Sequence, residues 1–434
     1  MRSSIGLTAG LAALLLTHAA LADPLPAVAS SSNMQIIGHS DLKGAGKGGE
    51  GMALRQYPDG RCILFLAHES APMCVSIIDV TKPEDPQVVT QIPVEAANLR
   101  CNSLGLSGTT LAVAHQTAKP GEPGAGMLVF DVADPAHPRK IGALDTSGPH
   151  SRGVHYLWFA DGQYAYLSTG AKDFTPRNKD DDQFLMIVDM HDPAHPSEVG
   201  RWWMAGTKVG DAAPSPPRVP IETGIRMHTP VVSAERPDRA YIGWIDGGFV
   251  ILDITDKAHP KLIAHRSWQS LGVGFAHTVL PIPSRNLAIQ TEEAVQANCK
   301  DWPKRDWVWD ISHETAPIVL SALPPPADFA VLCKQGGRFG AHNIHQNRPD
   351  PTSRKLTNTV VGSFFNGGVR AYSIADPDSP KEIGYLVDAP PPGNATHSIQ
   401  INDVYVDENG LIYADDRLSG GLDIIRYTGP VPLN

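Results

Sequence analysis

Residues 185–196, Leu-Met-Ile-Val-Asp-Met-His-Asp-Pro-Ala-His-Pro, decide the fold, because copies of this stretch recur along the chain. In the first five copies an apolar run ends in Asp, one more apolar residue follows, and a polar turn that contains Pro closes the unit. In the last two copies Ser373 and Arg426 stand in place of the Asp. The copies stand at 75–86, 127–138, 185–196, 249–260, 307–317, 369–380 and, truncated, at 422–430. Their anchor positions are separated by between 52 residues (79 to 131) and 64 residues (189 to 253). Seven units at such a period indicate one repeat architecture instead of seven domains.

Each unit reads as four antiparallel strands. In the third unit we expect them at 154–160, 163–169, 184–190 and 197–202, with Asp161-Gly162 as the first hairpin turn. The last unit lacks a fourth strand, whereas residues 34–38 near the start of the chain read like the fourth strand at 138–142. We therefore predict an all-β, seven-bladed β-propeller over residues 34–434, closed by residues 34–38 in blade seven.

This repeat pattern resembles that of the LVIVD-repeat family of β-propeller proteins, and the resemblance covers nearly all of the chain after residue 33. It implies a propeller fold. It does not imply an activity, because one fold hosts many functions.

The first residues have the form of a secretory signal. Arg2 supplies the basic start, an apolar run follows to Leu21, and small residues precede Asp23. The run is too short for a membrane anchor. We expect cleavage after Ala22, a disordered leader over residues 23–33, and a periplasmic or secreted protein without a membrane span.

The net charge of −10 argues against a nucleic-acid partner.

Five cysteines in an exported chain permit disulfides. Cys299 and Cys333 fall in insertions around the fifth repeat, and Cys74 and Cys101 stand in the same relation around the first. We predict these two bridges and a buried free thiol at Cys62.

The long loops are expected on one face of the propeller, which we call the top face. These are the loops from second to third strands and from fourth to first strands, at 117–126, 171–183, 204–225, 291–306, 324–341 and 388–396. The other connections are short and nearly uniform. Because binding residues concentrate on elaborated loops, we place the function on the top face.

Five of the 17 histidines stand where first strands begin, in blades three to seven: His155, His228, His277, His342 and His397. First strands are innermost in a propeller, so these rings should meet at the top of the central channel. If the first strand of blade seven begins later, Asp403 replaces His397. Neutral imidazoles from separate strands suit a divalent transition metal, with iron or copper favoured over zinc. The alternative is that each ring binds the backbone of a neighbouring blade and fills the channel.

Four further residues are candidates around this ring. Glu292 is expected to orient His277. Arg152, Arg226 and Arg338 precede ring histidines, and they either bind an anionic substrate or are paired with acidic residues of the loops.

The function predicted from these residues is that of a metal-dependent oxidoreductase acting on a small organic substrate. In architecture the arrangement is similar to the four-His iron of carotenoid-cleaving propellers and to the His-rich metal site of selenium-binding, methanethiol-oxidising propellers. Two alternatives stay open. One is a non-catalytic propeller that binds a protein or envelope partner through its top-face loops, and the other is a metal-dependent lyase or hydrolase. No serine-nucleophile, phosphate-loop or dinucleotide motif is present in the sequence.

Overall fold

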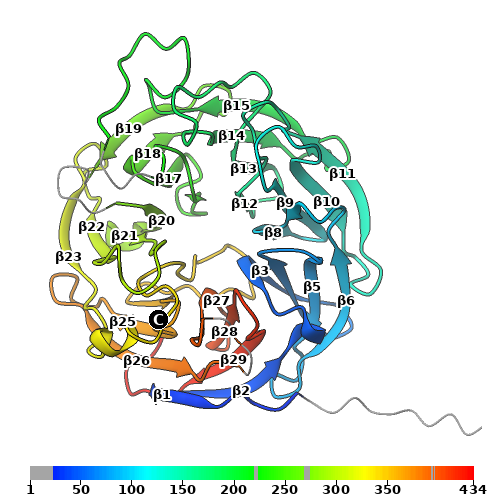
Figure 1. Ribbon diagram of the computed structural model, residues 1–434, viewed down its shortest axis with the longest axis vertical. Helices are drawn as coiled ribbons and strands as arrows, with labels where there is room; N and C mark the ends of the chain where they lie inside the picture. Colours follow the sequence, from blue (N-terminus) through cyan, green and yellow to red (C-terminus); the bar gives the residue numbers. More distant parts are fainter. Residues whose placement is uncertain (1–22, 219–222, 268–273, 392–393, 395) are drawn as a thin grey trace, which may run out of the picture.

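The computed structural model describes residues 23–218, 223–267, 274–391, 394 and 396–434. Its strands form seven small antiparallel sheets, which stand as blades around a central channel (Figure 1). The all-β, seven-bladed propeller is therefore confirmed. The proposed signal at residues 1–22 lies outside the described residues. Within the described ranges, no helix is long and apolar enough to span a bilayer.

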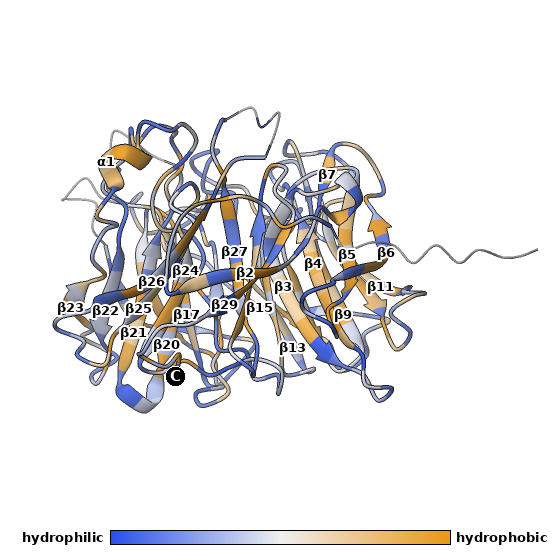
Figure 2. Cartoon of the chain, turned by 90° about the horizontal axis from the view of Figure 1, so that it is seen from below, coloured by the Kyte–Doolittle hydropathy of each residue, from blue (hydrophilic) through white to orange (hydrophobic). Residues whose placement is uncertain are grey.

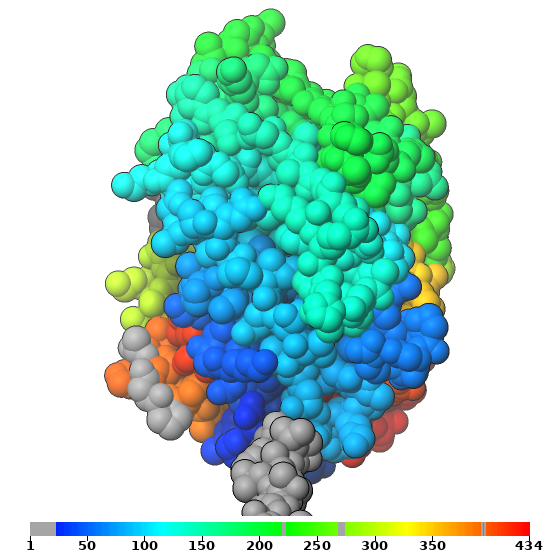
Figure 3. All heavy atoms as spheres, turned by 90° about the vertical axis from the view of Figure 1, so that its right-hand side faces the viewer, coloured from blue at the N-terminus to red at the C-terminus, as the bar shows by residue number. Residues whose placement is uncertain are grey.

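Blades one to three follow one another in chain order. Blade one contains β3 (Gly48–Gln56), β4 (Cys62–His68), β5 (Met73–Asp79) and β6 (Gln87–Pro93). Blade two contains β7 (Leu99–Arg100), β8 (Leu104–Ser107), β9 (Thr110–Thr117), β10 (Gly126–Asp131) and β11 (Arg139–Asp145). Blade three contains β12 (Tyr156–Phe159), β13 (Tyr164–Thr169), β14 (Phe184–Asp189) and β15 (Ser197–Trp202), close to the strands expected from the sequence. Figure 3 shows the side of the ring where the first blades lie.

The remaining blades complete the ring. Blade four contains β16 (Pro230–Val231), β17 (Arg239–Trp244), β18 (Gly248–Asp253) and β19 (Lys261–Arg266). Blade five contains β20 (Ala276–Ile282), β21 (Leu287–Glu292), β22 (Asp306–Asp310) and β23 (Ile318–Ala322). Blade six contains β24 (Thr359–Ser363), β25 (Val369–Ser373), β26 (Lys381–Asp388) and β1 (Val28–Ser32). Blade seven contains β27 (Ile401–Val406), β28 (Leu411–Asp416), β29 (Leu422–Tyr427) and β2 (Met34–Ser40).

The repeated Asp of the motif has a local structural role. It ends the third strand, and its carboxylate accepts a hydrogen bond from the backbone N–H two residues further on, as in the 2.9 Å bond from His191 N to Asp189. The same bond recurs at Asp131 and Asp253. In blade six Ser373 replaces the Asp, and its hydroxyl accepts from Ala375 N at 3.4 Å. The motif thus sets an Asx turn that reverses the chain into the fourth strand.

Blades pack face to face, so second and third strands are buried on both sides. All residues of β18 except Asp253 are buried, whereas the outer strand β15 is half exposed. Figure 2 shows β4, β5 and β9 as mostly hydrophobic along their length. These strands therefore read as continuous apolar runs, as expected for sheets that are covered on both faces.

The N-terminal segment closes the ring as predicted. Strand β2 pairs with β29 from Met34↔Tyr427 to Ser40↔Leu422, slightly longer than the expected 34–38. The expectation of a disordered leader at 23–33 is wrong for residues 28–32, because β1 pairs with the outer edge of β26. This second pairing covers a strand edge that would otherwise be open.

The innermost segment of blade six is extended but irregular. His342 N–H donates to Ser363 O (3.1 Å) and His345 N–H donates to Val361 O (2.9 Å), so residues 342–345 run along β24. The following segment, residues 346–358, crosses the end of the channel that lies opposite the top face (Figure 1).

The crossing segment binds three other blades. Gln346 Nε2 donates to Tyr156 Oη at 2.5 Å in blade three, and Thr352 Oγ1 donates to Leu54 O at 2.7 Å in blade one. Arg354 N–H donates to Val406 O at 3.0 Å in blade seven. The segment therefore links blades one, three and seven to blade six across the lower side of the ring.

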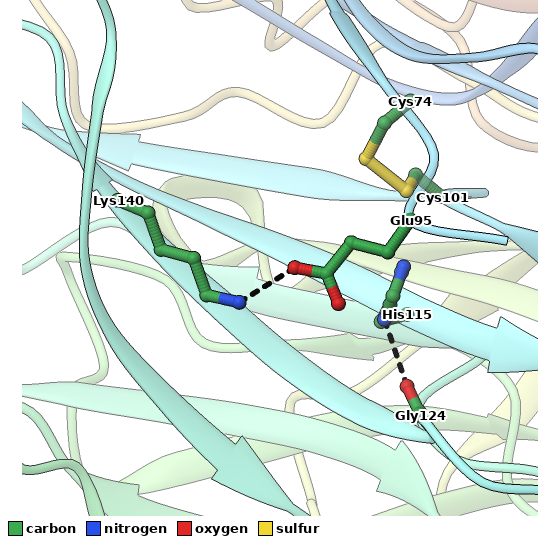
Figure 4. Close-up of a disulfide and its surroundings, with 6 residues drawn as sticks. All are labelled: Cys74, Glu95, Cys101, His115, Gly124 and Lys140. Atoms are coloured by element: carbon green, nitrogen blue, oxygen red, sulfur yellow. Dashed lines mark hydrogen bonds and ion pairs between the residues drawn. A yellow bond between two sulfur atoms is a disulfide. The ribbon is translucent and has the colours of Figure 1, made fainter.

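Both predicted disulfides are present. Cys74 of β5 is bonded to Cys101, beside the Glu95–Lys140 ion pair (Figure 4), and Cys299 is bonded to Cys333. Cys62 is free and half-buried, and burial raises the pKa of its thiol to about 12. Two disulfides agree with an exported protein.

The two N-terminal strands should differ in their effect on stability. A chain that begins at residue 34 loses only β1, whose residues are mostly exposed, and should unfold at nearly the same urea concentration as the chain from residue 23. A chain that begins at residue 41 also loses the buried Met34 and Ile36, so its free energy of unfolding should fall by at least about 3 kcal/mol. Urea unfolding followed by circular dichroism measures both. Equal losses in the two truncated chains would contradict closure through β2.

Candidate metal centre

Four of the five predicted histidines meet in the channel. His155 Nε2 and His228 Nε2 are 2.8 Å apart, and the ring centroids of His228 and His277 are 3.8 Å apart. The centroids of His277 and His342 are separated by 4.5 Å. Three of these residues are buried, and His155 is partly exposed. The convergence predicted from the repeat positions is therefore present in blades three to six.

Backbone hydrogen bonds place these histidines at equivalent positions along the axis of the propeller. The N–H groups of His155 and His228 donate to Ser168 O (2.9 Å) and Gly243 O (2.8 Å), near the top of the second strand of each blade. Gly243 is needed here, because a Cβ at this position would lie 2.1 Å from the carbonyl oxygen of His277 in the next blade. Blades four and five can thus bring His228 and His277 together only across a glycine.

The outer ring nitrogens are held by hydrogen bonds. His228 Nδ1 and His277 Nδ1 contact the hydroxyls of the following residues, Thr229 at 3.0 Å and Thr278 at 2.8 Å. His342 Nδ1 lies 2.7 Å from the carbonyl oxygen of Asn402. Because a carbonyl oxygen only accepts, His342 Nδ1 carries the proton and its Nε2 presents a lone pair to the channel.

The fourth ring, that of His155, is held by two side chains at its Nδ1. Gln116 Oε1 lies 3.1 Å and Arg100 Nη2 lies 3.2 Å from this nitrogen. Because the guanidinium can only donate and the amide oxygen can only accept, the two contacts favour opposite tautomers. His155 Nε2 lies 2.8 Å from His228 Nε2 on the inner side of the cluster.

A glutamate from blade one completes the cluster. Glu50 Oε2 lies 3.4 Å from His277 Nε2 and 3.8 Å from His228 Nε2, and Glu50 Oε1 lies 3.7 Å from His342 Nε2. The carboxylate thus stands among the imidazoles.

Glu50 was not predicted from the sequence, because ligands were expected only in blades three to seven. The register of β3 against β4 shifts between Gly48 and Met52, which moves the channel-facing position back along the chain. The sequence feature that could have indicated Glu50 is the glycine-rich run Gly48-Gly49-Glu50-Gly51. A Cβ at Gly49 would lie 2.6 Å from Asn102 O, so only glycines let this strand pass so close to blade two.

A second glutamate stands at the rim of the cluster. Glu293 Oε1 lies 3.7 Å from His342 Nε2, and Arg338 Nη1 donates to it at 2.7 Å. The predicted residue was its neighbour Glu292. That prediction is not supported by the described contacts, because His277 Nδ1 contacts Thr278 and Glu292 Oε2 accepts from Arg305 N–H at 3.3 Å. Burial raises the pKa of Glu292 to about 7.

Blade seven does not contribute the predicted ligand. His397 lies in an exposed turn with φ 56°, away from the channel entrance. Asp403, its proposed substitute, is buried, but its Oδ1 accepts from the N–H of Val404 at 2.8 Å, and it belongs to no cluster of potential ligands. Burial raises the pKa of Asp403 to about 8. The first strand of blade seven does begin later, at Ile401, but Glu50 takes the place expected for its side chain.

The protonation states suit a metal. Burial lowers the pKa of His155, His228 and His342 well below the usual value, so these rings are neutral. Burial alone would raise the pKa of Glu50, but the surrounding histidines bring it well below its usual range. Neutral imidazoles and a carboxylate are the forms that coordinate cations.

The distances also fit a single ion. Three overlapping triplets have their ligand atoms within 4.8 Å of one another: Glu50–His155–His228, Glu50–His277–His342 and His228–His277–Glu293. Two atoms that each lie ~2.1 Å from one ion are at most about 4.2 Å apart. The distances from Glu50 to His277, His228 and His342, which are 3.4, 3.8 and 3.7 Å, fall within this limit. His277 Nε2, His342 Nε2 and Glu50 Oε2 are buried and have no hydrogen-bond partner among the described residues. Buried polar atoms without partners are rare, and a cation would satisfy all three.

The three predicted arginines surround the cluster but are paired. Arg152 Nε donates to Asp182 at 2.7 Å, and Arg226 contacts Gln183 at 3.1 Å. Arg338 binds Glu293, as described above. Arg226 Nη1 also lies 3.5 Å from Asp182 Oδ1, so pairing with acidic residues, one of the two expected outcomes, is what the structure shows for all three arginines.

Comparisons with known proteins support the fold and the repeat. The family model of the LVIVD repeat matches residues 180–203 and 238–265, which lie in blades three and four. The chain thus carries LVIVD repeats on a seven-bladed β-propeller. A search of curated proteins found no match.

One solved structure, the Cps50 propeller domain, agrees with this fold. The β-propeller domain of Cps50 (Swd1) from Myceliophteria thermophila is similar with a TM-score of 0.52 and 14% sequence identity, covering 86% of this chain and 96% of that domain. The computationally designed Ika8 protein is similar with a TM-score of 0.47 and 10% identity, covering 88% of this chain and 97% of that one. At these identities the likeness concerns the fold alone.

Glu50 and Glu292 form a matched pair for testing the centre, since both are buried carboxyl groups near the channel. Glu50→Gln should weaken cobalt(II) binding by at least about 100-fold, because loss of outer-shell partners already costs about 10–100-fold. Glu292→Gln should bind cobalt(II) like the unchanged protein. Titration followed by visible absorption measures both affinities. Stronger weakening in Glu292→Gln than in Glu50→Gln would contradict the assignment.

Proposed function

We propose that the protein is an exported, periplasmic metal-dependent oxidoreductase that holds iron(II) at the His/Glu centre and acts on a small organic substrate. One observation carries this proposal. Four imidazoles and the carboxylate of Glu50 belong to overlapping triplets of potential ligand atoms, and three of these buried atoms have no hydrogen-bond partner among the described residues.

The ligand types favour iron. The histidines that the sequence predicted offer only nitrogen ligands, and such a set suits copper and zinc as well as iron. Glu50 adds an anionic oxygen, and mixed imidazole and carboxylate ligation is typical of non-haem iron(II) centres. When bound, such an ion would supply one-electron redox chemistry that the side chains cannot perform.

The surroundings favour catalysis over a purely structural ion. The crossing segment 346–358 runs across the lower side of the ring, and Phe365 stacks on His342 with centroids 4.5 Å apart. His155 alone among the four histidines is partly exposed. A substrate can therefore approach from one side only, while the other ligands are shielded from water. An open side is what separates catalytic metal sites from closed structural ones.

The chain's own residues then have defined tasks. Thr229, Thr278 and the carbonyl of Asn402 hold three rings in position through their Nδ1 atoms. Glu50 offsets positive charge at the centre. Arg338 holds Glu293 at the rim, where its carboxylate can accept a proton from a bound substrate.

Metal analysis tests the proposal directly. Protein purified without a His-tag should contain about one iron per chain, and it should consume oxygen with one or more members of a panel of small organic acids. Less than a tenth of an equivalent of any transition metal would contradict the proposal. One equivalent of zinc without oxygen uptake would point instead to lyase or hydrolase chemistry.

A matched pair of histidine variants should separate ligand loss from general damage. His277→Ala removes a buried ring from the centre, so metal content should fall below a tenth of that of the unchanged protein. His397→Ala removes an exposed ring, and its metal content should not change. Circular dichroism should show the same fold in both. Full metal content in His277→Ala would contradict the assigned ligand set.

A further inference from the structure

A cavity of about 420 Å³ opens on the top face between blades one and two, beside the exposed edge of the metal centre. Its wall includes Arg100 and Gln116, the two residues that hold His155. Because His155 is the partly exposed ligand, this cavity lies on the open side of the centre. A volume of this size is typical of small-molecule sites.

The cavity wall is positively charged, although the whole chain carries a net charge of −10. Lys47, Arg100 and Arg152 line it, against one carboxylate, that of Glu69. Glu69 is already bound twice, by Arg100 at 2.5 Å and by Arg417 at 2.8 Å. Its negative charge is therefore offset within the wall.

Hydrogen-bond donors in the wall remain available. Lys47 is exposed and makes no ion pair with any described residue. Arg152 binds Asp182 through Nε and Nη2, which leaves Nη1 without a partner in the described part of the chain. Gln116 is 1% exposed, and its Nε2 has no hydrogen-bond partner there. A buried amide donor without a partner in a cavity wall indicates a missing acceptor.

Other cavities of similar volume lack this combination. A cavity of about 530 Å³ beside blade two contains Lys140, but its ammonium group is bound to Glu95 at 2.6 Å (Figure 4). A cavity of about 480 Å³ near the N-terminal segment is lined by Asp41, Asp388 and Asp423. Among these three cavities, only the one between blades one and two is lined by a lysine without an ion pair among the described residues, Lys47, together with an arginine that keeps a free N–H group, Arg152.

We infer that this cavity is the substrate pocket of the metal centre and that it binds a small organic acid. The carboxylate of the acid pairs with Lys47 and Arg152, and the rest of the molecule reaches past the amide of Gln116 toward His155. The inference rests on the proposed function for the identity of the reacting centre. The pocket itself depends only on residues outside the ligand set.

The test uses 4-fluorobenzoate as a probe, followed by ¹⁹F NMR on the full chain loaded with zinc. The acid should bind and its neutral amide should not. Lys47→Glu and Arg152→Gln should each weaken binding by about tenfold or more, since each removes a charge-assisted contact. Lys82→Glu, which changes an exposed lysine on the opposite face, should bind the acid normally. No binding, equal binding of acid and amide, or unchanged affinity in Lys47→Glu and Arg152→Gln would overturn the pocket.

Cobalt(II) tests the approach to the metal. Bound 4-fluorobenzoate should give a broader ¹⁹F line in the cobalt-loaded protein than in the zinc-loaded one, because cobalt(II) is paramagnetic. Equal line widths would overturn the placement beside His155.

The metal-poor variant His277→Ala separates this inference from the proposed function. It should still bind the acid, because Lys47 and Arg152 do not belong to the ligand set. If the unchanged protein binds the acid but takes up no transition metal, the proposed function is refuted and the pocket stands. Normal metal content without acid binding would refute the pocket alone.

Discussion

The structure depends on one electrostatic constraint at the channel axis. Several lone-pair atoms of the same kind, the Nε2 atoms of four imidazoles, are forced together around a buried carboxylate. Without a shared proton or a cation such a cluster is unfavourable, because the nitrogens repel one another and cannot be solvated. Something else in the fold must hold the rings in place.

The closure of the seven blades into a ring holds the histidines in place. His155, His228 and His342 are each attached to the next strand of their own blade by a backbone hydrogen bond, and each blade packs against its neighbours through two buried apolar faces. Strand β2 joins the ends of the ring, so no single blade can move outward to relieve the repulsion. The hydrophobic free energy of the blades therefore sustains a polar cluster that would not form alone.

The same geometry explains the asymmetry of the site. Blades three to six supply histidines, while blade one supplies Glu50 from a strand with a shifted register. The positive wall between blades one and two then lies on the side where the ring of histidines ends. The open side of the centre and its charged cavity thus follow from one break in the repeat pattern.

Much of this could be predicted from the sequence. The recurring motif predicted seven blades. In five of them its Asp sets a local turn, which depends on one side chain and a backbone N–H two residues away. Both disulfides and the four histidines followed from their positions within the repeat. By contrast, the choice between Glu292 and Glu293 depends on the residue at which β21 ends, and no repeat position decides that.

The sequence by itself thus determined the fold, its closure and the imidazole ring, because these depend on local periodicity and on equivalent positions in successive repeats. Only the tertiary structure decided that Glu50 enters the cluster, that residues 28–32 pair with blade six and that His397 stays outside. Each of these depends on the distance between segments far apart in the chain. A register shift, a free strand edge or a glycine contact can change that distance without altering the repeat pattern.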